Sequence, residues 1–336
     1  VYIVGRLARN LQVICPRCGQ IGTLYYTRSI GFYVKHGPRI THHIRRNEAL
    51  EVKLNDETLN FIHYMGADTL LLPILAKLIP PHTTYVEVFG GSAPLLLNKS
   101  RSKVEVYNDI DGNLVNLFRV VRDKYSEFVK RAEFLLYSRA DYYYFVNNLD
   151  KLNDVDKAVA TFFIYNAGYA GKFAAGFSAG PKRNQAPDLF NKLRQKLKLI
   201  HKRLQNVVIE SLDFREIIKR YDTETTFFYL DPPHLYLGTE KTNDYYRVGE
   251  FSDKDYFDLL NMLTTIKGKF LLKQTNIVPY LEEWANKNGF STLKITLKKN
   301  IPVKKATGKF TKGDYPLLFV ANYKLPQINN EITLTT

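Results

Sequence analysis

The chain has 336 residues, of which 45% are hydrophobic and 24% are charged, so it is long enough for one large or two ordinary domains and is not a disordered polypeptide. Lys and Arg number 48 against 33 Asp and Glu, and the formal net charge of +15 favours a polyanionic partner, nucleic acid before an anionic membrane. No apolar run reaches the roughly 18 residues that span a bilayer, and no signal peptide is visible at Val1–Gln20. Two cysteines exclude a disulfide scaffold, and we expect a cytoplasmic protein without a membrane partner.

The first fifty residues predict a small β module. Short strand-like runs at Gly22–Ser29 and Gly31–Lys35 lie among glycines, and the polar stretch Asn47–Thr58 has the composition of a linker. We therefore expect one module over residues 1–50 and a larger domain over residues 55–336.

The two cysteines of this module suggest a metal site. Cys15 and Cys18 have the spacing of a zinc ribbon, and His36 with His42 or His43 would complete four ligands. One Cys pair with loosely spaced histidines is equally compatible with reduced cysteines in a reducing compartment. Zinc is therefore one of two interpretations of this pattern.

Beyond residue 60, short apolar runs alternate with helical patterns. Strands are predicted at Thr84–Phe89, Val104–Asp109, Val207–Glu210, Thr226–Leu230, Lys269–Lys273, Ser291–Lys298 and Leu317–Asn322. Helices are predicted at Leu70–Ile79, Pro94–Lys99, Phe214–Arg220, Asp253–Thr265 and Val278–Asn288, and residues 113–206 are predicted to be mostly helical. This alternation predicts an α/β fold with a doubly wound, mainly parallel sheet, in which ligands bind at the carboxyl ends of the strands.

Two strand ends in this sheet carry a candidate cofactor site. The run Thr84–Phe89 is followed by Gly90 and Gly91, which let a ligand approach the backbone closely. Asp109 closes the next strand at the distance expected of a carboxylate that binds ribose hydroxyls. The turn lacks the Gly-x-Gly-x-x-Gly spacing of dinucleotide folds, which disfavours a NAD enzyme and favours a cofactor without a pyrophosphate.

A third strand end carries a candidate catalytic site. Pro232 and Pro233 follow the strand Thr226–Leu230 and hold Asp231 at the carboxyl edge of the sheet. If the partner is nucleic acid, as the net charge favours, one possible target is the exocyclic amine of a base. Such an amine is a poor nucleophile because its lone pair is delocalised into the ring. Two acceptors, the Asp231 carboxylate and the Pro232 carbonyl, would free that lone pair, and the ring of His234 would stack on the flipped base.

These motifs together, in this order, resemble the Dam-like (D12 class) DNA adenine-N6 methyltransferases, which use S-adenosylmethionine. Asp231–His234 is similar to their Asp-Pro-Pro-Tyr signature, Glu87–Ser92 to their Phe-x-Gly-x-Gly loop, and Asn108–Asp111 to the Asn-Asp-Ile-Asn that follows it. Residues 63–68 stand in the place of a ring-x-Gly-Gly-Lys motif, and Asp213-Phe214 resembles the pair that cups the cofactor's adenine. The resemblance covers residues 60–323, with His234 in place of Tyr or Phe and Asp68 in place of Lys.

The resemblance implies a Rossmann-like methyltransferase sheet, double-stranded DNA as substrate, and site residues at matching positions. The implied catalytic residues are Asp231, Pro232, Pro233 and His234. The residues implied to bind S-adenosylmethionine are Tyr64, Gly66, Asp68, Glu87, Phe89, Gly90, Gly91, Asp109, Asp213, Phe214 and Asp231.

Residues 113–206 stand where the resembling family has its DNA-recognition insert. The segment is rich in basic and aromatic residues, which suit phosphate contacts and base flipping, and we expect DNA contacts from Tyr169, Lys172, Lys182 and Arg183. Tyr165–Gly171 resembles a stretch of the family in which Ala170 replaces an Asn. The alternatives are methylation of cytosine N4 or of RNA, and a non-catalytic nucleic-acid-binding protein on a decayed methyltransferase scaffold.

Overall fold

The computed structural model describes residues 12–14, 21–27, 31–35, 41–43, 58–64, 66–67, 69–181, 183–233, 251–275, 279–304, 310–326 and 331–332. The chain separates into two compact units, residues 1–59 with 98–101 and residues 60–97 with 102–336. No helix in the described part of the chain is both long enough and apolar enough to cross a membrane.

The first unit contains a four-stranded antiparallel sheet in the order β1-β2-β3-β4. Its strands are β1 (Gln12–Ile14), β2 (Ile21–Thr27), β3 (Gly31–Lys35) and β4 (Thr41–His43). The two strands expected from the sequence, near Gly22–Ser29 and at Gly31–Lys35, correspond to β2 and β3, which pair with each other.

The second unit is built on an eight-stranded sheet in the order β14-β12-β13-β11-β10-β5-β6-β9. Its strands are β5 (Thr84–Glu87), β6 (Val104–Asn108), β9 (Val207–Glu210), β10 (Thr226–Leu230), β11 (Lys269–Thr275), β12 (Ser291–Lys304), β13 (Phe310–Ala321) and β14 (Glu331–Ile332). Strands β9, β6, β5, β10 and β11 pair in parallel, while β13 runs antiparallel to both β11 and β12. The prediction of a doubly wound, mainly parallel sheet is confirmed.

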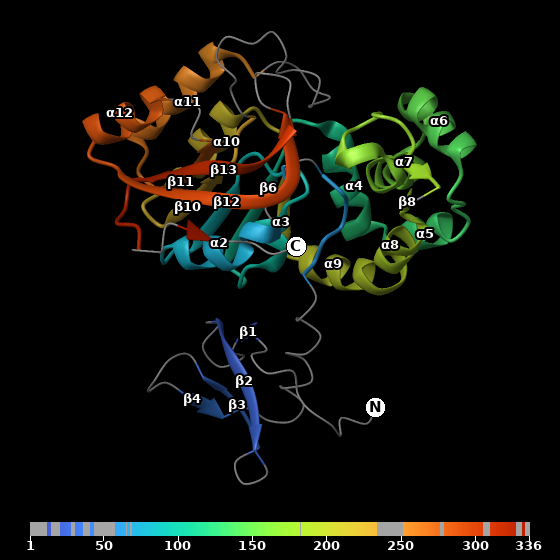
Figure 1. Cartoon of the computed structure of the whole chain (residues 1–336), viewed down its shortest axis with the longest axis horizontal. Helices are drawn as coiled ribbons and strands as arrows, with labels where there is room; N and C mark the ends of the chain where they lie inside the picture. Colours follow the sequence, from blue (N-terminus) through green and yellow to red (C-terminus); the bar gives the residue numbers. More distant parts are fainter. Residues whose placement is uncertain are drawn as a thin grey trace. The chain divides into compact units, whose positions relative to one another are not determined.

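Helices cover both faces of this sheet (Figure 1). One face carries α10 (Phe214–Tyr221), α11 (Asp253–Thr265) and α12 (Pro279–Lys287), and the other carries α2 (Leu72–Leu78), preceded by the 3-10 turn η1 (Thr69–Leu71), and α3 (Pro94–Asn98). Because both faces are covered, the central strands are mostly apolar, and every residue of β10 is buried. On the α10–α12 face, Val86, Phe228 and Leu272 of the sheet pack with Ile217, Leu259 and Leu281 of the helices.

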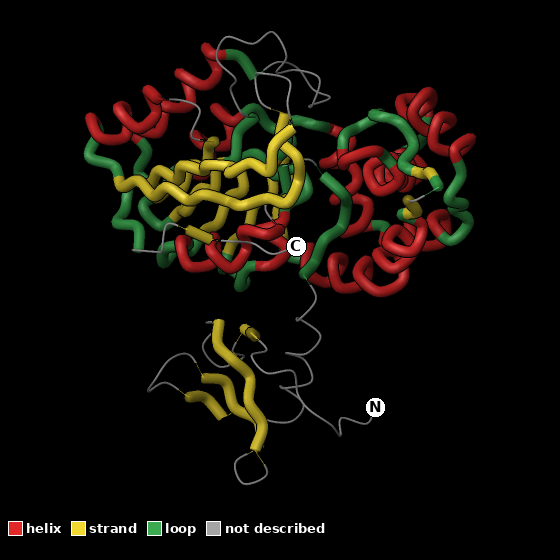
Figure 2. The backbone as a smooth tube through the Cα atoms, in the orientation of Figure 1, coloured by secondary structure: helices red, strands yellow, loops and turns green. Residues whose placement is uncertain are grey.

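Residues between β6 and β9 form a mostly helical lobe beside the sheet (Figure 2). Its helices are α4 (Gly112–Asp123), α5 (Tyr125–Ala132), α6 (Arg139–Asn148), α7 (Asp154–Ala167), α8 (Ala186–Asn191) and α9 (Leu197–Leu204). Helix α7 is buried over most of its length because α4, α5, α6 and α8 pack around it. The sequence did not predict the short 3-10 turns η2 (Leu149–Lys151) and η3 (Tyr169–Gly171), the π-helical turn η4 (Lys192–Lys196), or the two-stranded ribbon of β7 (Ala179–Gly180) and β8 (Arg183–Asn184).

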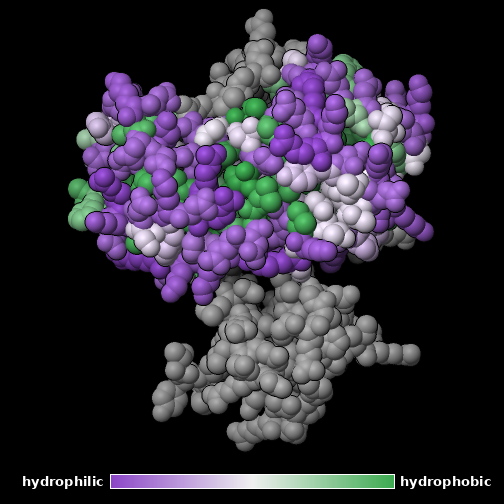
Figure 3. Space-filling view, turned by 180° about the vertical axis from the view of Figure 1, so that it is seen from behind, coloured by the Kyte–Doolittle hydropathy of each residue, from purple (hydrophilic) through white to green (hydrophobic). Residues whose placement is uncertain are grey.

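The strand order places a topological switch point between β5 and β10. The chain runs outward from β5 through β6 to β9 and then returns to β10 on the other side of β5. Helix connections therefore diverge at this point, and ligands in such sheets bind at the carboxyl ends of the strands beside it, here β5 and β10. Away from this edge, hydrophilic residues cover most of the reverse face of the unit, and hydrophobic residues gather near its middle (Figure 3).

Candidate active site

The loop after β5 is shaped by two glycines. A Cβ atom on Gly90 would lie 2.3 Å from the ring of Tyr107 and 2.8 Å from the backbone oxygen of Asn108, both on the neighbouring strand β6. Gly91 has a positive φ of +50°, and a Cβ there would lie 2.9 Å from the ring of Tyr64. Any side chain at these two positions would therefore displace β6 or Tyr64.

The segment before η1 packs onto this loop. The ring of Tyr64 lies beside Gly91 and contacts the ring of Tyr165 on α7, with centroids 5.5 Å apart. Gly66 turns the chain at a φ of +84°, and the N–H of Ala67 donates to the Tyr64 carbonyl. The structure thus places Tyr64, predicted to bind the cofactor, against the glycine loop, while Asp68 lies outside the described residues.

Asp109 lies at the end of β6 and faces the same loop. Its Oδ2 accepts from the N–H of Gly91 at 2.7 Å and its Oδ1 accepts from the N–H of Asp111 at 2.8 Å. Burial raises the pKa of Asp109 to about 6, and the two backbone donors only partly oppose that rise. A carboxylate has lone pairs for about four hydrogen bonds, so Asp109 can accept two further donors such as the hydroxyls of a ribose.

Asn108 holds three strand ends together, a role that the sequence analysis did not assign. Its buried side-chain amide donates to the carbonyls of Val88 and Leu212, at 2.9 and 3.0 Å, and its Oδ1 accepts from the N–H of Leu212. These bonds join the ends of β5, β6 and β9. An Asn directly before an Asp at a strand end was the available signal, but its partners are 20 and 104 residues away.

Asp213 and Phe214 begin α10 beside this clamp. Asp213 is the N-cap of the helix and accepts from the N–H of Arg215 at 2.8 Å. Phe214 packs with Phe89 and Phe251, with ring centroids 5.9 and 5.6 Å away. These three rings, of which Phe251 was not predicted, form an aromatic cluster next to the glycine loop.

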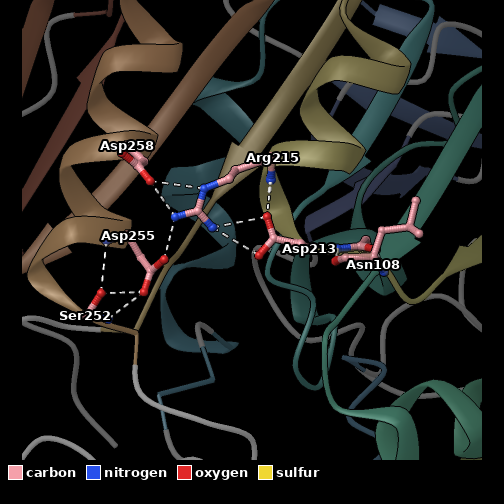
Figure 4. Close-up of polar contacts among 7 residues, drawn as sticks. Asn108, Asp213, Arg215, Ser252, Asp255 and Asp258 are labelled. Carbon is pink, nitrogen blue, oxygen red and sulfur yellow. Dashed lines mark hydrogen bonds and ion pairs between the residues drawn. The ribbon is translucent and has the colours of Figure 1, made fainter.

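Arg215 links the Asp213 loop to α11 (Figure 4). Its guanidinium lies between Asp213 on one side and Asp255 and Asp258 of α11 on the other, and it stacks over the Phe214 ring at 4.2 Å. Asp255 also completes a capping box with Ser252 at the start of α11. Burial would raise the pKa of Asp255, but hydrogen bonds, that from Arg215 first, lower it to about 2. The same hydrogen bond raises the pKa of Arg215.

The carboxylate of Glu87, also predicted to bind the cofactor, is hydrogen-bonded inside the protein. The side chain is buried and accepts from the Tyr85 hydroxyl at 2.7 Å and from the N–H of Leu96, in the first turn of α3, at 2.8 Å. These contacts fix α3 against β5. A direct contact between Glu87 and a cofactor stays a prediction.

Asp231 lies at the carboxyl end of β10, as predicted, and pairs with a lysine that the sequence analysis did not name. The Nζ atom of Lys273, on β11, lies 2.7 Å from Oδ2 of Asp231. Pro232 is buried and Pro233 half-buried, so the chain is stiff where it leaves the sheet. His234 lies outside the described residues, and its stacking role stays a prediction.

The helical lobe exposes part of the predicted DNA-binding set. The Tyr169 side chain is 53% exposed and Lys172 is half-buried. Arg183 begins β8 of the ribbon, whereas Lys182 is outside the described residues. Among the other aromatic residues of the segment, Tyr142 and Tyr165 are buried and belong to the core, while Tyr143 and Tyr144 are exposed.

Two basic residues of this lobe point inward. Lys192 donates to Asn166 at 2.8 Å and pairs with Asp188, which also lies 2.7 Å from His63. Burial lowers the pKa of Lys192 to about 8, and the hydrogen bond from His63 holds the pKa of Asp188 well below its usual value. Arg203 is buried and paired with Glu105. Neither cation is therefore placed for phosphate contact.

The proposed zinc ligands lie mostly beyond the described residues. Cys15, Cys18 and His36 fall outside them, and only the backbone of His42 is placed, in β4. Within the described ranges, no group of three or more His, Cys, Asp or Glu side chains could hold a metal. Zinc in the first unit stays a prediction.

The carboxyl edge around β5, β6 and β9 fits the cofactor that the sequence resemblance implies. The glycine loop leaves no room for a Cβ, Asp109 has spare acceptor capacity, and the buried ring of Phe214 belongs to an aromatic cluster beside them. A carboxylate acceptor and aromatic rings beside an open glycine loop suit a ligand that combines a ribose with an aromatic base.

Comparison with known proteins agrees with this geometry. The sequence matches the family described as D12 class N6 adenine-specific DNA methyltransferase over residues 64–301. It is 29% identical over 293 residues to Type II methyltransferase M.MjaIII of Methanocaldococcus jannaschii, and the match covers 78% of this chain and 98% of that protein. The prediction of a DNA methyltransferase, an enzyme class that uses S-adenosylmethionine, is confirmed. The chain belongs to the D12 class N6 adenine-specific DNA methyltransferase family.

Proposed function

We propose that the carboxyl edge of the second unit transfers a methyl group from S-adenosylmethionine to the N6 amine of adenine in double-stranded DNA. The cofactor, when bound, supplies a methyl group on a sulfonium. Tyr64, Gly91, Asp109 and Phe214 bind and orient it, with Asp109 accepting from the ribose hydroxyls. Asp231 and the carbonyl of Pro232 would accept the two hydrogens of the target amine and thereby free its lone pair for attack. As the N–C bond forms, the C–S bond of the sulfonium would break to leave a neutral thioether, and the methylated amine would lose one proton to water.

The observation that carries this proposal is the direct connection between the cofactor loop and the catalytic strand. The N–H of Val88, one residue before Phe89, donates to the carbonyl of Tyr229 at 3.1 Å, and Tyr229 lies two residues before Asp231. The glycine loop and the candidate acceptor of the amine therefore leave adjacent, hydrogen-bonded strands. Proximity of this kind is what an in-line transfer between two bound substrates requires.

The DNA substrate is supported by charge and by the helical lobe. The net charge of +15 favours a polyanion, and Arg194, Lys198 and Lys202 are exposed on the lobe. Tyr169 and the ribbon β7–β8 add an exposed ring and a narrow projection. We propose that this surface contacts the duplex while the target adenine enters the site beside Asp231.

The test is methyl transfer with mapping of the product. The purified chain is incubated with isotopically labelled S-adenosylmethionine and duplex DNA of mixed sequence, and the DNA is digested to nucleosides. Label in N6-methyladenine supports the proposal, while label in N4-methylcytosine, or transfer to RNA alone, redirects it to another base or polymer. A chain that binds DNA but neither binds the cofactor nor transfers label is a decayed scaffold, and the proposal is then wrong.

Zinc in the first unit is a separate proposal, supported by the Cys15 and Cys18 spacing alone. Metal analysis of freshly reduced protein should find about one equivalent of zinc per chain, and Cys15→Ser should remove it. Its absence would favour two reduced cysteines and would leave the methyltransferase proposal untouched.

A further inference from the structure

A lysine lies inside the sheet beside the candidate catalytic carboxylate. Strands β10 and β11 are parallel, with Leu230 paired to Leu272, so the next residues, Asp231 and Lys273, are lateral neighbours on one face. Nζ of Lys273 lies 2.7 Å from Oδ2 of Asp231. The lysine side chain is 3% exposed and the aspartate 21%, so the cation lies beneath the carboxylate.

Apolar residues lie beside Lys273 on its own face of the sheet. Leu271 is two residues before it in the strand, the antiparallel strand β13 pairs it with Phe319, and both are buried. Burial of a charged ammonium costs several kcal/mol unless it is paired. The ion pair with Asp231 therefore offsets part of the cost of burying this cation.

Asp109 shows what happens to a carboxylate at this edge that has only backbone donors. Burial raises its pKa to about 6. An ammonium in hydrogen-bond contact has the opposite influence, because an opposite charge within about 4–6 Å favours the ionised form. It also fixes the direction of the carboxylate plane through a charge-assisted hydrogen bond.

We propose that Lys273 is a positioning residue for methyl transfer: through its ion pair with Oδ2 it keeps Asp231 ionised and oriented to accept a hydrogen from the target amine. This inference rests on the proposed function. It assigns Lys273 no contact with the substrate and no proton transfer. It also makes Asp231 a hydrogen-bond acceptor of fixed charge and not a general base.

Other charged groups share this face of the sheet and enter the test. By the alternation of strand residues, Glu87 of β5 and Glu105 of β6 point the same way as Asp231, and Asp109 follows at the end of β6. Glu105 is paired with Arg203, which is also buried, and this pair lies toward the start of its strand. Arg203→Met is therefore a matched control, because it removes a buried cation from a carboxylate of the same sheet away from the carboxyl edge.

The experiment measures the steady-state kinetics of methyl transfer to duplex DNA against pH for wild type, Lys273→Met, Lys273→Arg and Arg203→Met. We expect Lys273→Met to lose at least tenfold in kcat with little change in cofactor KM, and its acid limb to move to higher pH by about 1–3 units. Lys273→Arg should restore the wild-type position of the acid limb even where its rate is lower. Arg203→Met should lose stability and leave the acid limb in place.

A readout independent of activity separates this inference from the proposed function. A double-mutant cycle of Asp231→Asn and Lys273→Met, followed by thermal unfolding of the full chain, should show coupled melting temperatures at pH 7. The coupling should vanish in acid. A carboxylate whose folded-state pKa is lowered by a cation stabilises the folded protein at pH values above its unfolded pKa, and this stabilisation is lost as pH falls through its folded pKa. If the wild type shows this coupling but transfers no methyl group, the proposed function is wrong while the ion pair between Lys273 and Asp231 stands. An unchanged kcat and acid limb in Lys273→Met, or no coupling at pH 7, would overturn the role of Lys273.

Discussion

The two sides of the switch point hold their carboxylates in different ways. On the β5–β6 side, Asp109 is held by the backbone N–H groups of Gly91 and Asp111, and its pKa is raised to about 6. On the β10–β11 side, Asp231 is held by the buried ammonium of Lys273. The first arrangement suits a carboxylate that must receive neutral hydroxyl donors, and the second suits one whose charge must be constant during a reaction. Three predictions test this difference, and a fourth concerns backbone strain elsewhere.

The largest effect is expected for Asp231→Asn. The amide keeps the size of the side chain but removes the negative charge that polarises the target amine, so kcat should fall on the order of 10²–10³-fold. Duplex affinity, measured by a fluorescence titration, should change little. The amide is preferred to Asp231→Ala because alanine would leave Lys273 buried without its partner, at a cost of about 3–5 kcal/mol of stability. A rate near that of the wild type would remove Asp231 from the mechanism.

Asp109→Ala should act on binding and not on the chemical step. Loss of one hydrogen bond to a charged acceptor costs about 1.5–3 kcal/mol, so cofactor affinity should weaken by at least on the order of 10–100-fold. Calorimetry measures the affinity, and turnover at saturating cofactor should be close to wild type. Asp111→Asn is the matched control, because Asp111 caps α4 and asparagine caps helices equally well. Equal affinities for Asp109→Ala and wild type would disprove the assignment.

The pH dependence of cofactor affinity should reveal the raised pKa of Asp109. Only the ionised carboxylate accepts two hydroxyl donors, so affinity should be constant above pH 7 and fall by up to about tenfold per unit below pH 6. The free protein responds in the opposite sense. A raised pKa means that the stability contributed by this group is present below about pH 4 and is lost as pH rises through about 6. Asp109→Ala should flatten the affinity profile, and a wild-type profile that is already flat down to pH 5 would contradict the pKa assignment.

The smallest effect is expected far from both carboxylates, at Ala170. This exposed residue has a left-handed backbone, with φ of 56° and ψ of 21°. Ala170→Gly should raise the free energy of unfolding by about 0.5–1 kcal/mol, since glycine adopts this conformation without strain. Ala175→Gly, at an exposed neighbour without positive φ, should be neutral or destabilising. Thermal unfolding compares the two variants. An equal fall in melting temperature in both would show that the backbone at Ala170 is not strained.

Strands and motif residues were predictable where a local pattern determines them. The buried strand Thr226–Leu230 was predicted to the residue, and Gly90, Gly91, Asp109 and Asp231 lie at the carboxyl edge as expected. The hairpin of β12 and β13 is longer than predicted because its outer parts are polar and become strands only by pairing with each other.

The unpredicted features depend on contacts between distant segments. The partner of Lys273 is 42 residues away, and it follows only from the register of β10 against β11. A lysine inside an apolar strand was the signal, since a buried cation requires an anion. In α6, three consecutive tyrosines give no periodicity, so packing alone decides that Tyr142 is buried and its neighbours Tyr143 and Tyr144 are exposed.

The side chain of Asn108 limits how far a change in the helical lobe can reach. The helical lobe leaves the sheet just after Asn108 and returns through β9 to Leu212, whose backbone bonds to that same amide. The side chain of Asn108 therefore joins the point where the chain enters the lobe to the point where it leaves, next to the cofactor loop. Changes of length or sequence within the lobe should therefore leave Asp109 and the glycine loop in place. If the lobe contacts the duplex as proposed, this one asparagine separates changes in DNA contacts from the site of methyl transfer.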